Sequence, residues 1–168
     1  ECDEPSRLVA VHPVIADLQR RHPGLRLPRT GRILAALVPA VLEQKVTGTE
    51  AFRAYSALLR LHGEPAPGPN GALRLPPDPR TLAGLPYHAW HSLGVERRRA
   101  DVIRGAAARA DWLAAAAPAT DQLDRRLRSL PGIGPGTSAE VRRVARGDPD
   151  AISIGDYHLA NVVAWALA

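Results

Sequence analysis

Two short segments of this sequence carry residue types that can bind a phosphate or stabilise a positive charge. The first spans residues 130–137 and reads LPGIGPGT, and the second spans residues 155–158 and reads GDYH. Glycines at alternate positions let a backbone turn sharply and approach a phosphate, which then meets free amides and the positive dipole at the start of the next helix. We expect Ile133 to anchor this turn in the core. A glycine- and proline-rich turn without a ligand is the alternative that the residues alone leave open.

Asp156 is the carboxylate of the second segment. An aspartate that opens a helix is ordinarily an N-cap, and the amides that it caps also keep it ionised. An ionised carboxylate can stabilise a positive charge that develops during a reaction. Capping and catalysis are therefore compatible at Asp156.

The charge of the chain favours a polyanionic partner. The 168 residues carry a formal net charge of +5, and Lys45 is the only lysine, so arginine supplies nearly all of the positive charge. Arginine makes planar, bidentate contacts with phosphate, and neutralised phosphates release counterions. Codon usage in a GC-rich bacterial genome explains the arginines equally well.

The cysteine content excludes several kinds of site. Cys2 is the only cysteine, so the sequence has no internal disulfide, no four-cysteine zinc site and no four-cysteine iron–sulfur cluster. No stretch approaches 18 uncharged apolar residues, and no basic region followed by an apolar run opens the sequence. We expect a cytoplasmic, nucleoid-associated monomer without membrane contact. The sequence lacks an initiating methionine and ends within an apolar helical pattern, so we expect it to be part of a longer chain.

The elements around these segments are predicted to be helices. An apolar stripe from Ile33 to Leu42 indicates a buried helix with Thr30 as its N-cap and Pro39 as a kink or first-turn residue. A second amphipathic pattern runs from Phe52 to His62. Further helices are predicted over residues 81–85, 87–93, 97–117, 121–130, 137–146 and 156–168. The only strand-like stretch, at 151–154, is short. Residues 64–79 are predicted to be a loop without regular structure.

These elements predict an all-α fold. We expect one core over residues 1–168, arranged as a two-lobed helical bundle in which the loop at 64–79 separates two helical halves. Residues 121–147 are predicted to form two helices joined by a glycine-rich hairpin.

The two segments together resemble the signature of the helix-hairpin-helix DNA glycosylase superfamily. In that family an LPGIGxxTA-like hairpin precedes an aspartate at the start of a helix, and here Asp156 lies twenty positions after Gly136. This spacing is similar to that of the 3-methyladenine, alkylation-repair branch. Residues 42–47, LEQKVT, resemble the helix end that precedes the DNA-intercalating loop of the family. The resemblance implies the DNA-glycosylase fold, with double-stranded DNA containing a damaged base as the partner.

The resemblance also implies roles for individual residues. Asp156 would be the catalytic carboxylate, and the DNA-binding residues would be Gly132, Ile133, Gly134, Gly136, Thr137, His158 and Gln44. Among these, His158 would touch a backbone phosphate and Gln44 would fill the gap left by an extruded nucleotide. Each also has a structural alternative: His158 could be a histidine held by a partner within the protein, and Gln44 could be an ordinary glutamine at the end of a helix.

Three further residues are candidates for the base pocket. The aromatic faces of Tyr157 and Trp90 could stack on a base, although such residues are more often part of the core. Glu140 lies where the alkylation-repair branch can place an aromatic residue. We favour the interpretation of Glu140 as a solvated helix residue over that of a polar reader of the base.

Gly136 decides what reaction the resemblance implies. Family members that also cleave the backbone carry a lysine nucleophile at this hairpin position, and glycine cannot form a Schiff base. The resemblance thus implies a monofunctional enzyme that hydrolyses the N-glycosidic bond without a required cofactor, with a monovalent cation as a possible ligand of the hairpin carbonyls. The alkylation-repair branch often has tryptophan at this position, so Gly136 is a departure that affects pocket shape and substrate.

Three alternatives stay open. A non-catalytic helix-hairpin-helix module would bind DNA but has no use for Asp156 beside a sugar. An adenine-mismatch or oxidised-base glycosylase fits less well, because the cluster cysteines and the hairpin lysine are missing and Pro39 stands about where a catalytic glutamate would be expected. A helical protein-interaction domain with incidental charge would bind DNA weakly and without catalysis.

Overall fold

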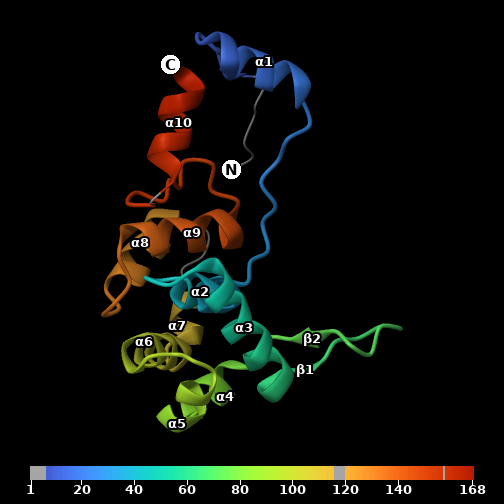
Figure 1. Ribbon diagram of the computed structural model, residues 1–168, viewed down its shortest axis with the longest axis vertical. Coiled ribbons are helices and arrows are strands. Elements are labelled where there is room, and N and C mark those ends of the chain that lie inside the picture. The colour runs from blue at the N-terminus through green and yellow to red at the C-terminus, as the bar shows by residue number, and fades with distance from the viewer. Residues whose placement is uncertain (1–6, 116–119, 157) are drawn as a thin grey trace.

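The computed structural model describes residues 7–115, 120–156 and 158–168, and it confirms the predicted all-α class. Within these ranges the chain forms ten helices and one two-stranded ribbon (Figure 1). The elements are α1 (Pro13–Arg21), α2 (Ile33–Leu42), α3 (Gly48–His62), β1 (Glu64–Pro65), β2 (Arg74–Leu75), α4 (Pro79–Gly84), α5 (Tyr87–Ser92), α6 (Arg97–Ala107), α7 (Ala110–Ala114), α8 (Thr120–Arg128), α9 (Pro135–Arg146) and α10 (Leu159–Leu167).

Helix α2 lies at the centre of the molecule. Its buried residues are Ile33, Ala36, Leu37, Val38, Ala40, Val41 and Leu42. A helix that is apolar nearly all round must be enclosed by other elements, and α2 contacts α3, α6, α7 and α9. Figure 1 shows α8 and α9 on one side of it and α4 to α6 on the other. Pro39 lies inside the helix, beyond its first turn, and the helix continues through it to Leu42.

The predicted N-cap of α2 is wrong. The helix begins at Ile33 after Arg32, and no side chain caps it. The Thr30 hydroxyl instead donates to the carbonyl of Val144 at 3.0 Å, and the amide of Gly31 donates to the carbonyl of Ala145 at 2.9 Å. Thr30 therefore joins the start of α2 to the last turn of α9, a contact between positions more than a hundred residues apart.

Several element boundaries also differ from the prediction. The helix predicted at 97–117 is two helices, α6 and α7, because the chain bends after Ala107. Helix α7 packs against α2 and α8, where Leu113 is buried. Residues 116 and 117 of the prediction lie outside the described residues. Within the predicted loop at 64–79, Glu64 pairs with Leu75 and Pro65 with Arg74 in a short antiparallel ribbon. This ribbon has no further strands, so the proline removes no donor that a larger sheet would need. Residues 151–154 form no strand.

The helices near the two ends of the sequence contain no buried residues. Helix α1 was not predicted, since it places no apolar stripe in the core. Helix α10 begins at Leu159, three residues later than predicted, and Trp165 on it is 86% exposed. Within the described residues, no helix is both long and apolar enough to cross a membrane.

We predict that Leu37→Ala destabilises the protein by about 2 to 5 kcal/mol, because Leu37 is completely buried in α2 and its loss leaves a cavity. Equilibrium unfolding in urea measures the effect. The control is Leu61→Ala in α3, where the side chain is 61% exposed and the change should stay within about 0.5 kcal/mol. Equal losses in the two variants would contradict the central position of α2.

Candidate active site and nucleic-acid interface

Residues 130–134 form a tight hairpin between α8 and α9, and residues 135–137 are the first turn of α9, which begins two residues earlier than predicted. The amide of Ile133 donates to the carbonyl of Leu130 at 3.2 Å, and the Ile133 side chain is buried, as predicted. Gly132 has a φ of +89°, a conformation that favours glycine. The sequence folds into a hairpin here because a positive φ follows Pro131 and an apolar side chain then returns to the core.

Gly132 also brings the hairpin into direct contact with α6. A Cβ atom added at Gly132 would lie 2.3 Å from Cγ2 of Val102, whereas one added at Gly134 would have no atom within 4 Å. The first glycine of the hairpin is therefore required by packing inside the protein. The second, Gly134, is exposed and faces open space.

The start of α9 is open to an anionic ligand. Gly134 is the N-cap residue and provides no side-chain cap, and Pro135 has no amide hydrogen. The amides of Gly134, Gly136 and Thr137 have no acceptor in the parts of the chain that the structure describes. Unpaired amides combined with the helix dipole are the usual elements of a phosphate-binding site.

The turn between α2 and α3 is fastened to this hairpin by Gln44. Its Nε2 atom donates to the carbonyl of Gly132 at 3.1 Å and to Oγ1 of Thr137 at 2.9 Å. The next residue, Lys45, is exposed and has a φ of +58°, the one positive φ of a non-glycine residue among those described. Such a backbone costs about 1 to 2 kcal/mol and persists only where its neighbours are held in place. The role of Gln44 in filling a gap in DNA stays a prediction.

Asp156 follows a tight turn. Its amide donates to the carbonyl of Ser153 at 3.1 Å, and Gly155 has a φ of +91°, as the third residue of a type II turn requires. Oδ1 of Asp156 accepts hydrogen bonds from the amides of His158, at 2.9 Å, and Leu159, at 2.6 Å. The carboxylate thus caps the entrance to α10 from a position two residues before the N-cap residue, His158.

The same contacts keep the carboxylate charged. The amide of Leu159, then that of His158, lowers the pKa of Asp156 below its ordinary value, and the charge of His158 acts in the same direction. Asp156 is exposed, and its Oδ2 atom has no hydrogen-bond partner among the described residues. One oxygen is therefore fixed by the backbone, and no described residue binds the other.

The two segments singled out in the sequence lie together in the structure. A Cβ atom added at Gly136 would be 3.0 Å from the carbonyl oxygen of Ile154, two residues before Asp156. The missing side chain at Gly136 lets the turn that carries Asp156 rest against the first turn of α9. The turn that precedes Asp156 therefore lies next to the amides at the start of α9 that have no acceptor among the described residues.

Trp90 is not part of this site. Its side chain is completely buried in the core from α5, so it has no free face on which a base could stack. Glu140 lies on α9 and forms an ion pair with Arg143, whose Nε atom is 3.1 Å from Oε2. His158 is exposed. Tyr157, the other aromatic candidate, lies outside the described residues.

Sequence reasoning missed a polar network that holds the segment leading to Asp156. Arg142 on α9 binds Asp148 at 2.7 Å, where the connection to α10 begins. The hydroxyl of Ser138, also on α9, donates to Asp124 of α8 at 2.7 Å. Ser138 is completely buried and Asp148 is 9% exposed, so these bonds fix the helices and the connection relative to one another. No sequence spacing identifies such pairs before the helices are placed.

No family model matches this chain, and no curated protein matches its sequence. Solved structures do match its fold. A 3-methyladenine DNA glycosylase from Archaeoglobus fulgidus superposes with a TM-score of 0.78 at 18% identity, over 91% of this chain and 53% of that one. The Schizosaccharomyces pombe 3-methyladenine DNA glycosylase Mag1, in complex with abasic DNA, gives 0.74 at 17% identity, over 96% and 79%.

A third solved structure belongs to a different branch. The 8-oxoguanine glycosylase/lyase of Clostridium acetobutylicum gives a TM-score of 0.72 at 12% identity, over 98% of this chain and 57% of that one. The chain spans about half the length of the Archaeoglobus and Clostridium proteins. This chain has the helix-hairpin-helix DNA-glycosylase fold. Structures of 3-methyladenine glycosylases and of an 8-oxoguanine glycosylase/lyase both share this fold.

We predict that Gly132→Ala destabilises the protein by at least about 2 kcal/mol, because alanine is strained at a positive φ and its Cβ overlaps Val102. The matched control is Gly134→Ala, at a φ of −92° with open space around it, which should cost less than about 1 kcal/mol, because alanine is a poorer N-cap residue than glycine but meets no other atom here. Thermal unfolding compares them. If adding Val102→Ala to Gly132→Ala restores none of the lost stability, the close packing of the hairpin against α6 is not the cause of the loss.

Proposed function

We propose that this chain is the core of a monofunctional DNA glycosylase that excises damaged, alkylated bases from duplex DNA. The observation that carries the proposal is the position of Asp156. Its Oδ1 atom is held by two amides, its Oδ2 atom has no hydrogen-bond partner among the described residues, and its turn lies against Gly136 at the open start of α9. Phosphate binding and stabilisation of a sugar cation can thus occur side by side.

The hairpin supplies the grip on DNA in this proposal. The amides of Gly134, Gly136 and Thr137 bind a backbone phosphate at the positive end of α9, and His158 contacts a second one. Gln44 helps to keep the hairpin in this shape through its bonds to Gly132 and Thr137. We also propose that Gln44 borders the space that an extruded nucleotide leaves, since it lies in the turn next to the hairpin.

The chemistry assigned to Asp156 is hydrolysis of the N-glycosidic bond. Extruding the nucleotide costs a few kcal/mol, less for a damaged base, and exposes its sugar carbon C1′. The bond between C1′ and the base nitrogen breaks with its electron pair going to the base, and the carboxylate stabilises the cationic sugar. A water molecule then bonds to C1′ through its oxygen and gives up a proton, which leaves an abasic site.

The residue at position 136 and the state of the substrate both favour a simple hydrolysis. Gly136 has no amine, so no Schiff base can form at that hairpin position. A base that is positively charged by alkylation leaves as a neutral molecule, so one carboxylate suffices and no cofactor is required. A monovalent cation at the hairpin carbonyls stays a prediction, and the Gly132 carbonyl already accepts a bond from Gln44.

One structural finding bears on the base pocket. Both oxygens of Glu140 are engaged by Arg143, which favours its interpretation as a helix residue over that of a base reader. Tyr157 adjoins Asp156 in sequence and is the remaining aromatic candidate. We propose, finally, that the protein acts as a monomer on the nucleoid.

We predict that Asp156→Asn lowers the rate of base release from alkylated duplex DNA on the order of 10²-fold or more while DNA binding survives. Asparagine keeps a side-chain oxygen for the cap bonds but loses the charge that stabilises the sugar cation. Single-turnover release of free base measures the effect. The control is Asp150→Asn, an exposed carboxylate on the same connection, which should retain the wild-type rate.

A wild-type protein that binds DNA but releases no base from alkylated, deaminated or oxidised duplexes would favour the non-catalytic module instead. Loss of release in both aspartate variants would point to general electrostatics of the connection rather than to Asp156.

The pH dependence of release follows from the lowered pKa of Asp156. Because the amides of Leu159 and His158 stabilise the ionised form, protonation of Asp156 should slow release only as the pH falls below 3.8, the ordinary pKa of an aspartate. A profile of single-turnover release between about pH 4.5 and about pH 8 should thus show no loss caused by this carboxylate. An acid limb near pH 6 that disappears in Asp156→Asn would contradict the prediction.

A further inference from the structure

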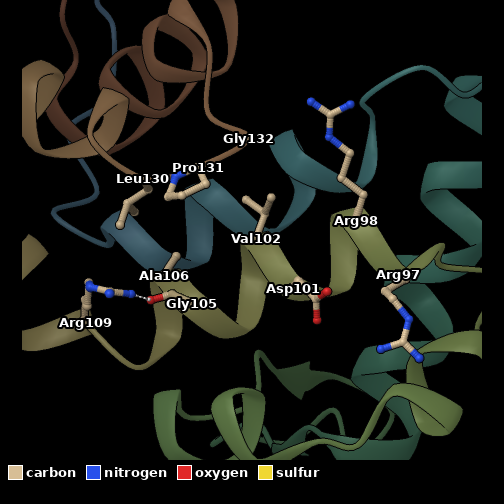
Figure 2. A pocket seen from close by; sticks show the side chains of 10 residues that line it. All are labelled: Arg97, Arg98, Asp101, Val102, Gly105, Ala106, Arg109, Leu130, Pro131 and Gly132. Carbon is tan, nitrogen blue, oxygen red and sulfur yellow. Dashed lines mark hydrogen bonds between the residues drawn. The ribbon is translucent and has the colours of Figure 1, made fainter.

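A cavity of about 760 Å³ opens between α6 and the hairpin (Figure 2). Its apolar part is formed by Val102, Ala106, Leu130 and Pro131, and arginines 97, 98 and 109 border it. Gly132 also lines the cavity, so the cavity begins on the hairpin itself. We call this feature the α6 groove.

None of the three arginines of the α6 groove forms an ion pair with an acidic residue of the described part of the chain. Arg98 is exposed and makes no hydrogen bond or ion pair within the described ranges. Nη1 of Arg109 donates to the carbonyl of Gly105 at 3.1 Å, and the guanidinium of Arg97 lies 4.2 Å from the ring centre of Tyr87. These contacts leave the positive charges uncompensated.

The one acidic residue that lines the groove is engaged elsewhere. Asp101 forms an ion pair at 3.4 Å with Arg104, which does not line the cavity. The α6 groove is therefore a positively charged rim around an apolar floor, and a ligand that matches it must carry several negative charges together with apolar surface.

The spacing of the arginines selects a long ligand. Arg98 lies in the first turn of α6, and Arg109 follows the last residue of that helix, Ala107, by two positions. The nine residue steps from Arg98 to Ala107 correspond to roughly 14 Å along the helix axis. Successive phosphates of one DNA strand are about 3.4 Å apart along the duplex axis, so this length covers about four nucleotides. A single phosphate is much shorter than this length. A sugar–phosphate backbone could reach both and lay its apolar sugars over Val102 and Pro131.

We propose that the α6 groove binds the phosphodiester backbone of DNA as a second contact, separate from the free amides of the hairpin. Arg98 and Arg109 are the phosphate ligands of this contact. The inference rests on the proposed function for the choice of DNA as the polyanion. It adds that α6 and the hairpin contact the same DNA, because Val102 of α6 packs directly on Gly132 of the hairpin.

The test is the salt dependence of binding to an undamaged duplex, measured by fluorescence anisotropy. The groove variant is Arg98→Ala with Arg109→Ala, and the matched control is Arg60→Ala with Arg74→Ala, two exposed arginines that do not line the groove. Each lost phosphate contact lowers the slope of log K against log salt by about 0.9. We expect the groove variant to lose between about one and two units of slope, with the control unchanged.

A second variant, Arg98→Lys with Arg109→Lys, keeps the charge and should retain most of the slope. The proposal is overturned if the groove variant keeps the wild-type slope, if the control loses as much, or if inorganic triphosphate competes as strongly as DNA of equal phosphate concentration. Undamaged DNA makes the result independent of catalysis. If binding depends on the groove but the wild-type protein releases no base, the proposed glycosylase is refuted and the DNA contact of the groove is supported. If the wild-type protein releases base but the groove variant keeps the wild-type slope, the glycosylase is supported and the groove contact is refuted.

Discussion

Burial of α2 restricts every element that could form the site. Because α2 contacts α3, α6, α7 and α9, its neighbours can enclose it in only a few ways. Both of its ends are then tied to the helix that follows the hairpin. Thr30 and Gly31 bond to the last turn of α9, and Gln44 bonds to Gly132 and Thr137 at the other end. Helices α2 and α9 are thus antiparallel, and hydrophobic burial places the hairpin at a fixed point.

The hairpin glycines differ in what they do, although the sequence makes them look alike. At Gly132 the missing side chain admits Val102, and at Gly136 it admits the carbonyl of Ile154. Only Gly134 has no protein atom near the place of its absent Cβ. Two of the three glycines therefore bring protein segments together, and the third leaves room for a ligand. A glycine motif identifies close approach, and the structure is needed to say what approaches.

The parts of the fold that could be predicted are those in which neighbours along the chain decide the outcome. The stripe from Ile33 to Leu42 predicts a buried helix because each turn repeats the same apolar contacts. Thr30 was misassigned because its partner, Val144, is distant in sequence. Trp90 was a pocket candidate by its aromatic ring alone, and only the packing of α5 shows that it is buried. The meeting of Gly136 with Ile154 likewise depends on tertiary placement.

The arginines show why net charge alone says little about a partner. Arg99 is buried and donates to the carbonyl of Leu42 at 2.8 Å, so its charge stabilises the negative end of the α2 dipole. Arg142 binds Asp148, and Arg143 binds Glu140. These three positive charges have structural roles and would be retained without any nucleic acid. Arg98, by contrast, has no such role in the described part of the chain and borders an apolar groove beside the hairpin. What singles out Arg98 is therefore its place beside the hairpin, and not its charge alone.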